Sequence, residues 1–245
     1  MTHARLKPFG LALLAALGLM AFAAVGAQAA NEFLLLDPGK TFAEEKVISE
    51  SFLGEQESEL FRFIVAKGEE PYELWCRGTS VTGTVYPTLL HAHFIFENCH
   101  TAEIFIKENH YYPLKTLEED AWLCRVVDQT FDTNLKAVPV LHEKETFLLW
   151  EALETGKPFA VVRYEGIGCP WKQVEFTGTV VSKMLQLNEV SQLFTFDPIT
   201  TLLFQSKGLP GDKLLHTGGR ETYIEAALFK LHLIGPFFNK AWGAH

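Results

Sequence analysis

The sequence is poor in positive charge and carries few of the short motifs that mark enzymes. Its 245 residues include 21 Lys and Arg against 30 Asp and Glu, which gives a formal net charge of −9. No basic stripe interrupts this acidic balance, so the sequence argues against nucleic acid and anionic membranes as partners. No glycine-rich phosphate loop precedes a predicted helix, and residues 78–83 are one residue too long for a G-x-S-x-G nucleophile turn. Composition and motifs therefore favour a binding role over catalysis.

Residues 1–30 have the pattern of a cleaved signal peptide. Arg5 and Lys7 precede an apolar run over residues 11–25, and Ala27-Gln28-Ala29 follows as an A-x-A cleavage site. We expect cleavage after Ala29 or Ala30, which places the protein outside the cytoplasm, secreted or in the cell envelope. Loss of the two basic residues changes the formal charge from −9 to −11.

The sequence also lacks a second long apolar run. The segment over residues 224–238 is interrupted by Glu225, Lys230, His232 and Pro236. An uninterrupted run of about 20 residues is needed to span a bilayer as a helix. We therefore expect no transmembrane segment in the mature chain, which forms a single β-rich domain over residues 31–245.

The four cysteines all lie in the exported part of the chain, at Cys76, Cys99, Cys124 and Cys169. An even number in an oxidising compartment favours two disulfides. Three pairings are open, and the sequential pairing closes the shorter loops. Buried free thiols are the alternative.

Short runs of β-forming residues separated by Gly and Pro corners fill the mature chain. They predict an all-β fold, an antiparallel β-sandwich or open barrel. Phe supplies 20 of the 31 aromatic residues, and Phe at alternate strand positions is typical of a core. We expect separate strands over 72–77 and 80–85.

Two further strands are expected over 90–97 and 102–107, with a corner at residues 98–100. The segments 145–154 and 223–234 suit either a strand or a helix, and 109–120 is the most loop-like stretch. The sequence Thr-Gly-Thr-Val occurs at 82–85 and again at 177–180. It hints at two related halves with a boundary near 132–146, or it marks a bulge in each strand.

Several marks resemble a group of exported bacterial β-rich proteins that has no assigned activity. The shared features are a leader, Cys76 with Gly78, Thr-Gly-Thr-Val at 82–85, the run from Phe94 to Cys99, and Cys124. It continues at Cys169 with residues 174–181, and at Gly218-Gly219 with Trp242-Gly243. It spans most of the mature chain and implies a fold class without a chemistry.

The chain has one His-x-His sequence, His91 and His93, followed by Glu97. Side chains two and four positions apart on a strand share a face. Two imidazoles and a carboxylate suit a transition metal ion. The pattern resembles the first motif of cupins, although the glycines of that motif are absent, since Val85 and Ile104 occupy their places. The alternative is a polar strand face in water.

A third candidate is an aromatic cluster, Tyr111 and Tyr112 beside Trp122, in a predicted loop. Tyr and Trp rings with exposed polar groups suit a glycan or another cell-surface ligand. The alternative is that these rings fix the loop to the sheet.

The sequence thus predicts an exported, non-enzymatic β-rich protein with a binding or envelope role, without a cofactor. The alternative function is a cupin-like metalloprotein with one transition metal ion.

Overall fold

A computed structural model describes twelve parts of the chain. They are residues 32–36, 46–58, 60–65, 72–107, 110–113, 125–166, 169, 171–185, 189–196, 216–217, 220–225 and 227–244. For a minority of these, including 102–107 and 110–113, only the backbone is described. All of them belong to one unit of the chain, Asn31–His245.

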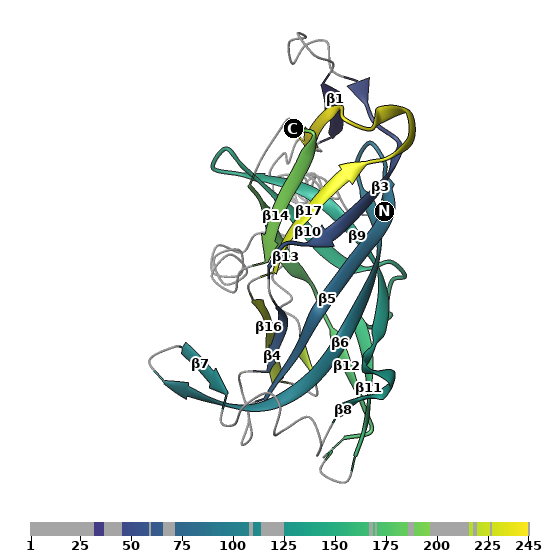
Figure 1. The fold of residues 1–245 in the computed structure, drawn as a ribbon. Helices are drawn as coiled ribbons and strands as arrows, with labels where there is room; N and C mark the ends of the chain where they lie inside the picture. Colours follow the sequence, from purple (N-terminus) through teal and green to yellow (C-terminus); the bar gives the residue numbers. More distant parts are fainter. Residues whose placement is uncertain are drawn as a thin grey trace, which may run out of the picture. The chain divides into compact units, whose positions relative to one another are not determined.

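The described chain is built almost entirely of β-strands (Figure 1). The strands are β1 (Phe33–Leu36), β2 (Lys46–Val47), β3 (Glu50–Gln56), β4 (Phe61–Val65), β5 (Tyr72–Val85), β6 (Leu90–Lys107), β7 (His110–Pro113), β8 (Arg125–Val126), β9 (Phe131–His142), β10 (Glu145–Ala152), β11 (Ala160–Glu165), β12 (Gln173–Thr177), β13 (Val180–Met184), β14 (Ser191–Phe196), β15 (His216–Thr217), β16 (Arg220–Glu225), β17 (Ala227–Leu233) and β18 (Ala241–Ala244). Two 3₁₀ turns, η2 (Val127–Gln129) and η3 (Gly235–Phe237), are the helical elements among these residues. No helix in the described ranges is long and apolar enough to cross a membrane.

The main sheet closes on itself. Its antiparallel pairings run from β5 through β3, β17, β14, β13, β10, β9 and β6, and β6 pairs with β5 again. A second circuit shares β5 and β6 and passes through β8, β11, β12, β15, β16 and β4. The predicted all-β antiparallel class is confirmed, and the sheet forms a closed barrel.

The two circuits belong to one barrel. Most of its chain segments consist of two consecutive strands, one in each circuit. Only Gly178 and Thr179 separate β12 from β13, and one residue separates β16 from β17. β3 and β4 are likewise consecutive in the chain, and both pair with β5. The chain therefore runs up and down around the barrel, and neighbours in sequence are neighbours in the sheet.

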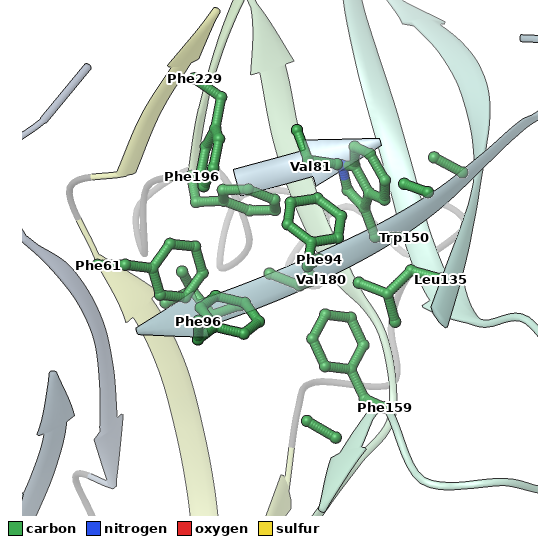
Figure 2. Close-up of a cluster of buried hydrophobic side chains, with 14 of the residues drawn as sticks. Phe61, Val81, Phe94, Phe96, Leu135, Trp150, Phe159, Val180, Phe196 and Phe229 are labelled. Carbon is green, nitrogen blue, oxygen red and sulfur yellow. The ribbon is translucent and has the colours of Figure 1, made fainter. Parts of the chain in front are cut away.

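Aromatic side chains from many strands fill the interior (Figure 2). Phe94 and Phe96 project from β6 into this core, where Phe94 meets the edge of Trp150 with ring centroids 5.4 Å apart. Phe96 stacks on Phe131 with centroids 4.5 Å apart. The buried indole of Trp150 donates a 2.8 Å hydrogen bond to the hydroxyl of Ser182. The prediction that alternating Phe residues form the core is confirmed.

β5 and β6 are longer than the sequence indicated, and they lie side by side as the blue and teal strands of Figure 1. The corner predicted at residues 98–100 and the break predicted at Gly78 are wrong. The ladder skips only the Arg77–Asn98 position and resumes in the same register. Asn98 has a left-handed φ of 51°, which Asn tolerates better than most residues. Asn98 therefore interrupts the ladder without turning the chain.

This interruption changes which side chains face the core. Ala92, Phe94 and Phe96 are buried before Asn98, whereas Cys99 is buried after it. Odd positions therefore replace even positions on the inner face of β6. A strict period of two cannot predict such a switch.

Cys76 and Cys99 face each other across β5 and β6 and form a disulfide, with their Cα atoms 4.1 Å apart. Both side chains are fully buried. Cys169 is also disulfide-bonded, while Cys124 lies outside the described residues. The preferred sequential pairing is thus confirmed for its first half.

A separate three-stranded sheet, β2–β1–β18, pairs the first described strand with the last. Its Phe33 and Trp242 are buried with the barrel core. The backbone N–H of Phe33 donates to the carbonyl of Pro87 in the β5–β6 turn, at 2.7 Å. Gln192 of β14 donates to the carbonyl of Trp242 at 2.6 Å. This sheet packs at the β5–β6 turn and ties the first and last described strands to the barrel.

The segments that suited either a strand or a helix are strands. β10 occupies most of 145–154, and β16 with β17 occupies most of 223–234. Residues 110–113, predicted as loop, form β7, which pairs with residues 104–107 of β6. The repeated Thr-Gly-Thr-Val lies in β5 and across the β12–β13 break, and the duplication stays a prediction.

Gly83 gives the sharpest stability test of the β5–β6 contact. A Cβ at Gly83 would overlap the backbone carbonyl of His91 and the ring of Phe52. We expect Gly83→Ala to lower the free energy of unfolding by about 1–3 kcal/mol, because the backbone must move. The matched control is Gly78→Ala on the same strand, where the nearest atoms to a Cβ are 3.5 Å away. Urea unfolding that shows equal changes for both variants would contradict this account.

Candidate functional site

His91, His93 and Glu97 lie on the outer face of β6. The residues between them, such as Ala92 and Phe94, are buried, whereas the side chain of His93 is 36% exposed. The three side chains therefore share a face, as the alternation predicted, and that face points away from the core.

The two histidines have different neighbours. His93 Nδ1 lies 3.0 Å from Asn134 Oδ1 and 3.8 Å from Asp132 Oδ2. The ring of His91 instead meets the edge of Tyr86, with centroids 5.0 Å apart. Within the described ranges, no three His, Cys, Asp or Glu side chains are grouped to hold a metal ion. The two imidazoles therefore contact different neighbours, and the exposed Ile95 lies between His93 and Glu97 on the same face.

Tyr111 and Tyr112 lie in β7, opposite Ile106 and Phe105 of β6. Their side chains and all of Trp122 lie outside the described residues. The structure therefore places the two tyrosines on an added strand, and the aromatic cluster stays a prediction. The β-forming Tyr111-Tyr112 pair was the available signal for this strand.

A stack of three side chains lies on the outside of the barrel behind the disulfide. The indole of Trp75 is buried and stacks on His100, with centroids 4.7 Å apart. The Arg77 guanidinium carbon lies 5.3 Å from the Trp75 ring centroid. Burial, and then the charge of Arg77, lower the pKa of His100. Both effects disfavour the charged imidazole, and the stack supports the β5–β6 pair, in which Trp75 and His100 are directly opposed.

The described surface has a hollow of about 420 Å³ beside Trp171, just before β12. Its lining residues are Tyr72, Trp171, Gln173, Val174, Glu175, Thr177 and Thr217. Small-ligand sites commonly fall within about 300–1,000 Å³ and combine aromatic side chains with a few placed polar groups. The hollow has this size and this chemistry.

Two aromatic rings form the apolar wall of the hollow. Tyr72 and Trp171 pack with ring centroids 4.6 Å apart. Tyr72 is almost fully buried at the start of β5, whereas Trp171 is only partly buried against the core. A ligand in the hollow therefore meets the indole more than the phenol.

β12 supplies the polar wall because it alternates strictly. Val174 and Phe176 are buried, and Gln173, Glu175 and Thr177 are exposed. Gln173 Nε2 donates to Glu175 Oε1 at 3.1 Å, which orients the carboxylate.

Thr217 of β15 closes the hollow on the neighbouring strand, and its hydroxyl donates to the backbone carbonyl of Glu175 at 3.2 Å. Glu175 is the only charged side chain among the lining residues.

Tyr164 of β11 lies near Tyr72 of the hollow, and its phenol is buried. Burial raises the pKa of Tyr164 well above its ordinary value, and the Tyr72 phenol raises it further. Both causes disfavour the phenolate. Among the residues that the structure describes, the Tyr164 hydroxyl has no hydrogen-bond partner.

Sequence reasoning missed this hollow. The alternation of residues 173–177 is visible in the sequence, but Tyr72 and Trp171 come from distant parts of the chain. Only the closed sheet brings these two rings together.

No family model matches this chain, and neither the curated proteins nor the solved structures contain a match to it. The site is therefore argued from its own geometry.

The metal hypothesis predicts a bound ion that His91→Ala would remove. We expect instead that the purified protein holds less than one equivalent of any transition metal, and that His91→Ala leaves the content unchanged. The reason is that His91 and His93 contact different neighbours on an open face. Elemental analysis of both proteins measures this, and a stoichiometric metal lost in the variant would restore the cupin-like hypothesis.

Tyr164 predicts an alkaline limit to stability. The pKa of Tyr164 is higher in the folded state than in the unfolded state. The stability that the neutral phenol contributes is therefore fully present below a pH of about 10, and it is lost as the pH rises further. We expect Tyr164→Phe to lose stability less steeply above that pH. At pH 7 it should match or exceed the parent protein by about 1 kcal/mol, since it removes a buried unpaired hydroxyl.

Urea unfolding between pH 7 and 11 measures the Tyr164 effect. Tyr86→Phe is the matched control, because Tyr86 is 37% exposed. An alkaline slope that is equal for Tyr164→Phe and the parent would rule out this role for Tyr164.

Proposed function

We propose that this protein is an exported, non-enzymatic binding protein of the cell envelope or exterior, with its ligand site in the hollow beside Trp171. The observation that carries the proposal is the pairing of an aromatic wall, Tyr72 and Trp171, with an oriented carboxylate, Glu175, around about 420 Å³. Such a wall supplies contact area, and the polar side supplies orientation.

The leader pattern and the cysteines support an extracytoplasmic location. The buried Cys76–Cys99 bond is of a kind that persists in oxidising compartments and is rare in the cytosol. The acidic mature chain agrees with a soluble ligand better than with nucleic acid.

The packed core supports a site at the surface. Phe94, Phe96 and Trp150 occupy the space that a ligand would need inside the barrel. Eight-stranded barrels have interiors that side chains alone can fill. A ligand is therefore better placed at the hollow than among these rings.

The lining favours binding over catalysis. The Thr217 hydroxyl donates to a backbone carbonyl, and Glu175 is exposed and bonded to Gln173. A hydroxyl nucleophile needs a base within hydrogen-bond reach. Neither contact pairs a nucleophile with a base.

The proposal is tested with protein secreted by a bacterial host. Its measured mass should match a chain that begins at Ala30 or Asn31, which shows that the leader has been removed. Its thermal midpoint is then measured with maltose, choline or inorganic phosphate at millimolar concentration. We expect at least one compound to raise the midpoint, because ligands that bind only the folded state stabilise it.

The variant Trp171→Ala should lose this rise, and Lys172→Ala should keep it, since Lys172 is exposed and does not line the hollow. A parent protein that responds to none of the three compounds, or a Trp171→Ala protein that responds fully, would overturn the proposed site.

A further inference from the structure

We propose that the hollow binds a neutral saccharide, with a pyranose ring against Trp171 and its hydroxyl groups on Gln173 and Glu175. This inference rests on the proposed function and names the ligand class of the same site.

The aromatic wall offers one open ring system. Tyr72 is 5% exposed and lies against Trp171 with an interplanar angle of 35°, so the partly exposed indole is the main contact surface. The face of an aromatic ring carries partial negative charge. The C–H groups of a pyranose are weakly positive and form an apolar surface, so they suit this face.

The polar wall offers acceptors in a row. Gln173, Glu175 and Thr177 project from the same side of β12. A carboxylate has about four acceptor positions, and the amide of Gln173 occupies one of them. The remaining positions and the Gln173 carbonyl can accept hydrogen bonds from adjacent sugar hydroxyls, which lie on the rim of the ring.

The negative charge of the hollow favours a neutral saccharide over an anion as its ligand. Among the described residues that line the hollow, Glu175 carries the only charge, so these side chains would repel a phosphate or carboxylate ligand and offer it no basic partner. A neutral polyol avoids this repulsion and the large desolvation cost of a buried charge.

The competing ligand is an organic cation. Quaternary ammonium groups are recognised by cages of aromatic rings that surround the charge. Here the two rings pack on each other at 4.6 Å, so they cannot enclose a cation from two sides. The arrangement therefore favours a flat ligand that stacks on a single ring.

The test is equilibrium titration of the purified protein, followed by tryptophan fluorescence and calorimetry. The probes are glucose, N-acetylglucosamine, maltose and cellobiose, with choline and inorganic phosphate as the other classes. We expect at least one sugar to bind and to change the fluorescence. Trp171→Ala should weaken that sugar at least about tenfold, whereas Trp171→Phe should retain most of the affinity because it keeps a ring.

Glu175→Gln discriminates between the ligand classes. It keeps an accepting oxygen but removes the charge, so sugar affinity should fall by no more than about tenfold, because a neutral acceptor makes a weaker hydrogen bond, whereas the affinity of a cation would fall much further. Lys172→Ala is the control for general effects, and circular dichroism confirms that each variant is folded.

The outcomes separate the two proposals. Choline binding that Glu175→Gln abolishes, without sugar binding, would overturn the saccharide assignment and leave the binding site in place. Phosphate binding alone would also overturn it. If no probe binds the parent protein, both the saccharide assignment and the proposed function fail.

Discussion

The constant register between β5 and β6 is the constraint on which the rest of the structure depends. These strands stay aligned from Tyr72 opposite Glu103 to Val85 opposite Leu90, and both circuits of the barrel close through them. A slip of one residue would move every side chain to the opposite face. The Cys76–Cys99 bond joins directly opposed residues, so it fixes this register covalently. Phe94 and Phe96 can then occupy the interior that the other strands surround.

A filled barrel limits where binding can occur. Interiors are packed nearly as densely as organic crystals, and removing a buried Phe side chain costs about 3–5 kcal/mol. A cavity among the core rings would therefore be expensive to maintain. The hollow avoids this cost, because β12 buries Val174 and Phe176 while its polar residues face outward. The alternation that packs the core also provides the polar wall of the site.

The sequence predicted what depends on local pattern. The β class, the Phe-rich core and the first disulfide followed from composition, alternation and cysteine count, and the structure confirms them. The error at Asn98 has a physical cause, since a polar residue with a left-handed backbone can mark an irregular ladder position as well as a turn. The hollow could not be predicted from the sequence, because Tyr72 and Trp171 come together only when the barrel closes. The outer position of His91 and His93 agrees with the alternative that the sequence offered, a polar strand face opposite the buried Phe94 and Phe96.

Trp171 connects the stability of the barrel to the proposed site. Its ring packs on Tyr72, and the phenol of Tyr72 lies close enough to Tyr164 to raise the pKa of that buried group. The backbone N–H of Tyr164 also donates to the carbonyl of Lys172, at 2.9 Å. The indole is therefore held by its packing on Tyr72, and the backbone of the next residue is held by this bond to β11. A site positioned by such packing loses little side-chain freedom on binding, and preorganisation of this kind raises affinity without new contacts.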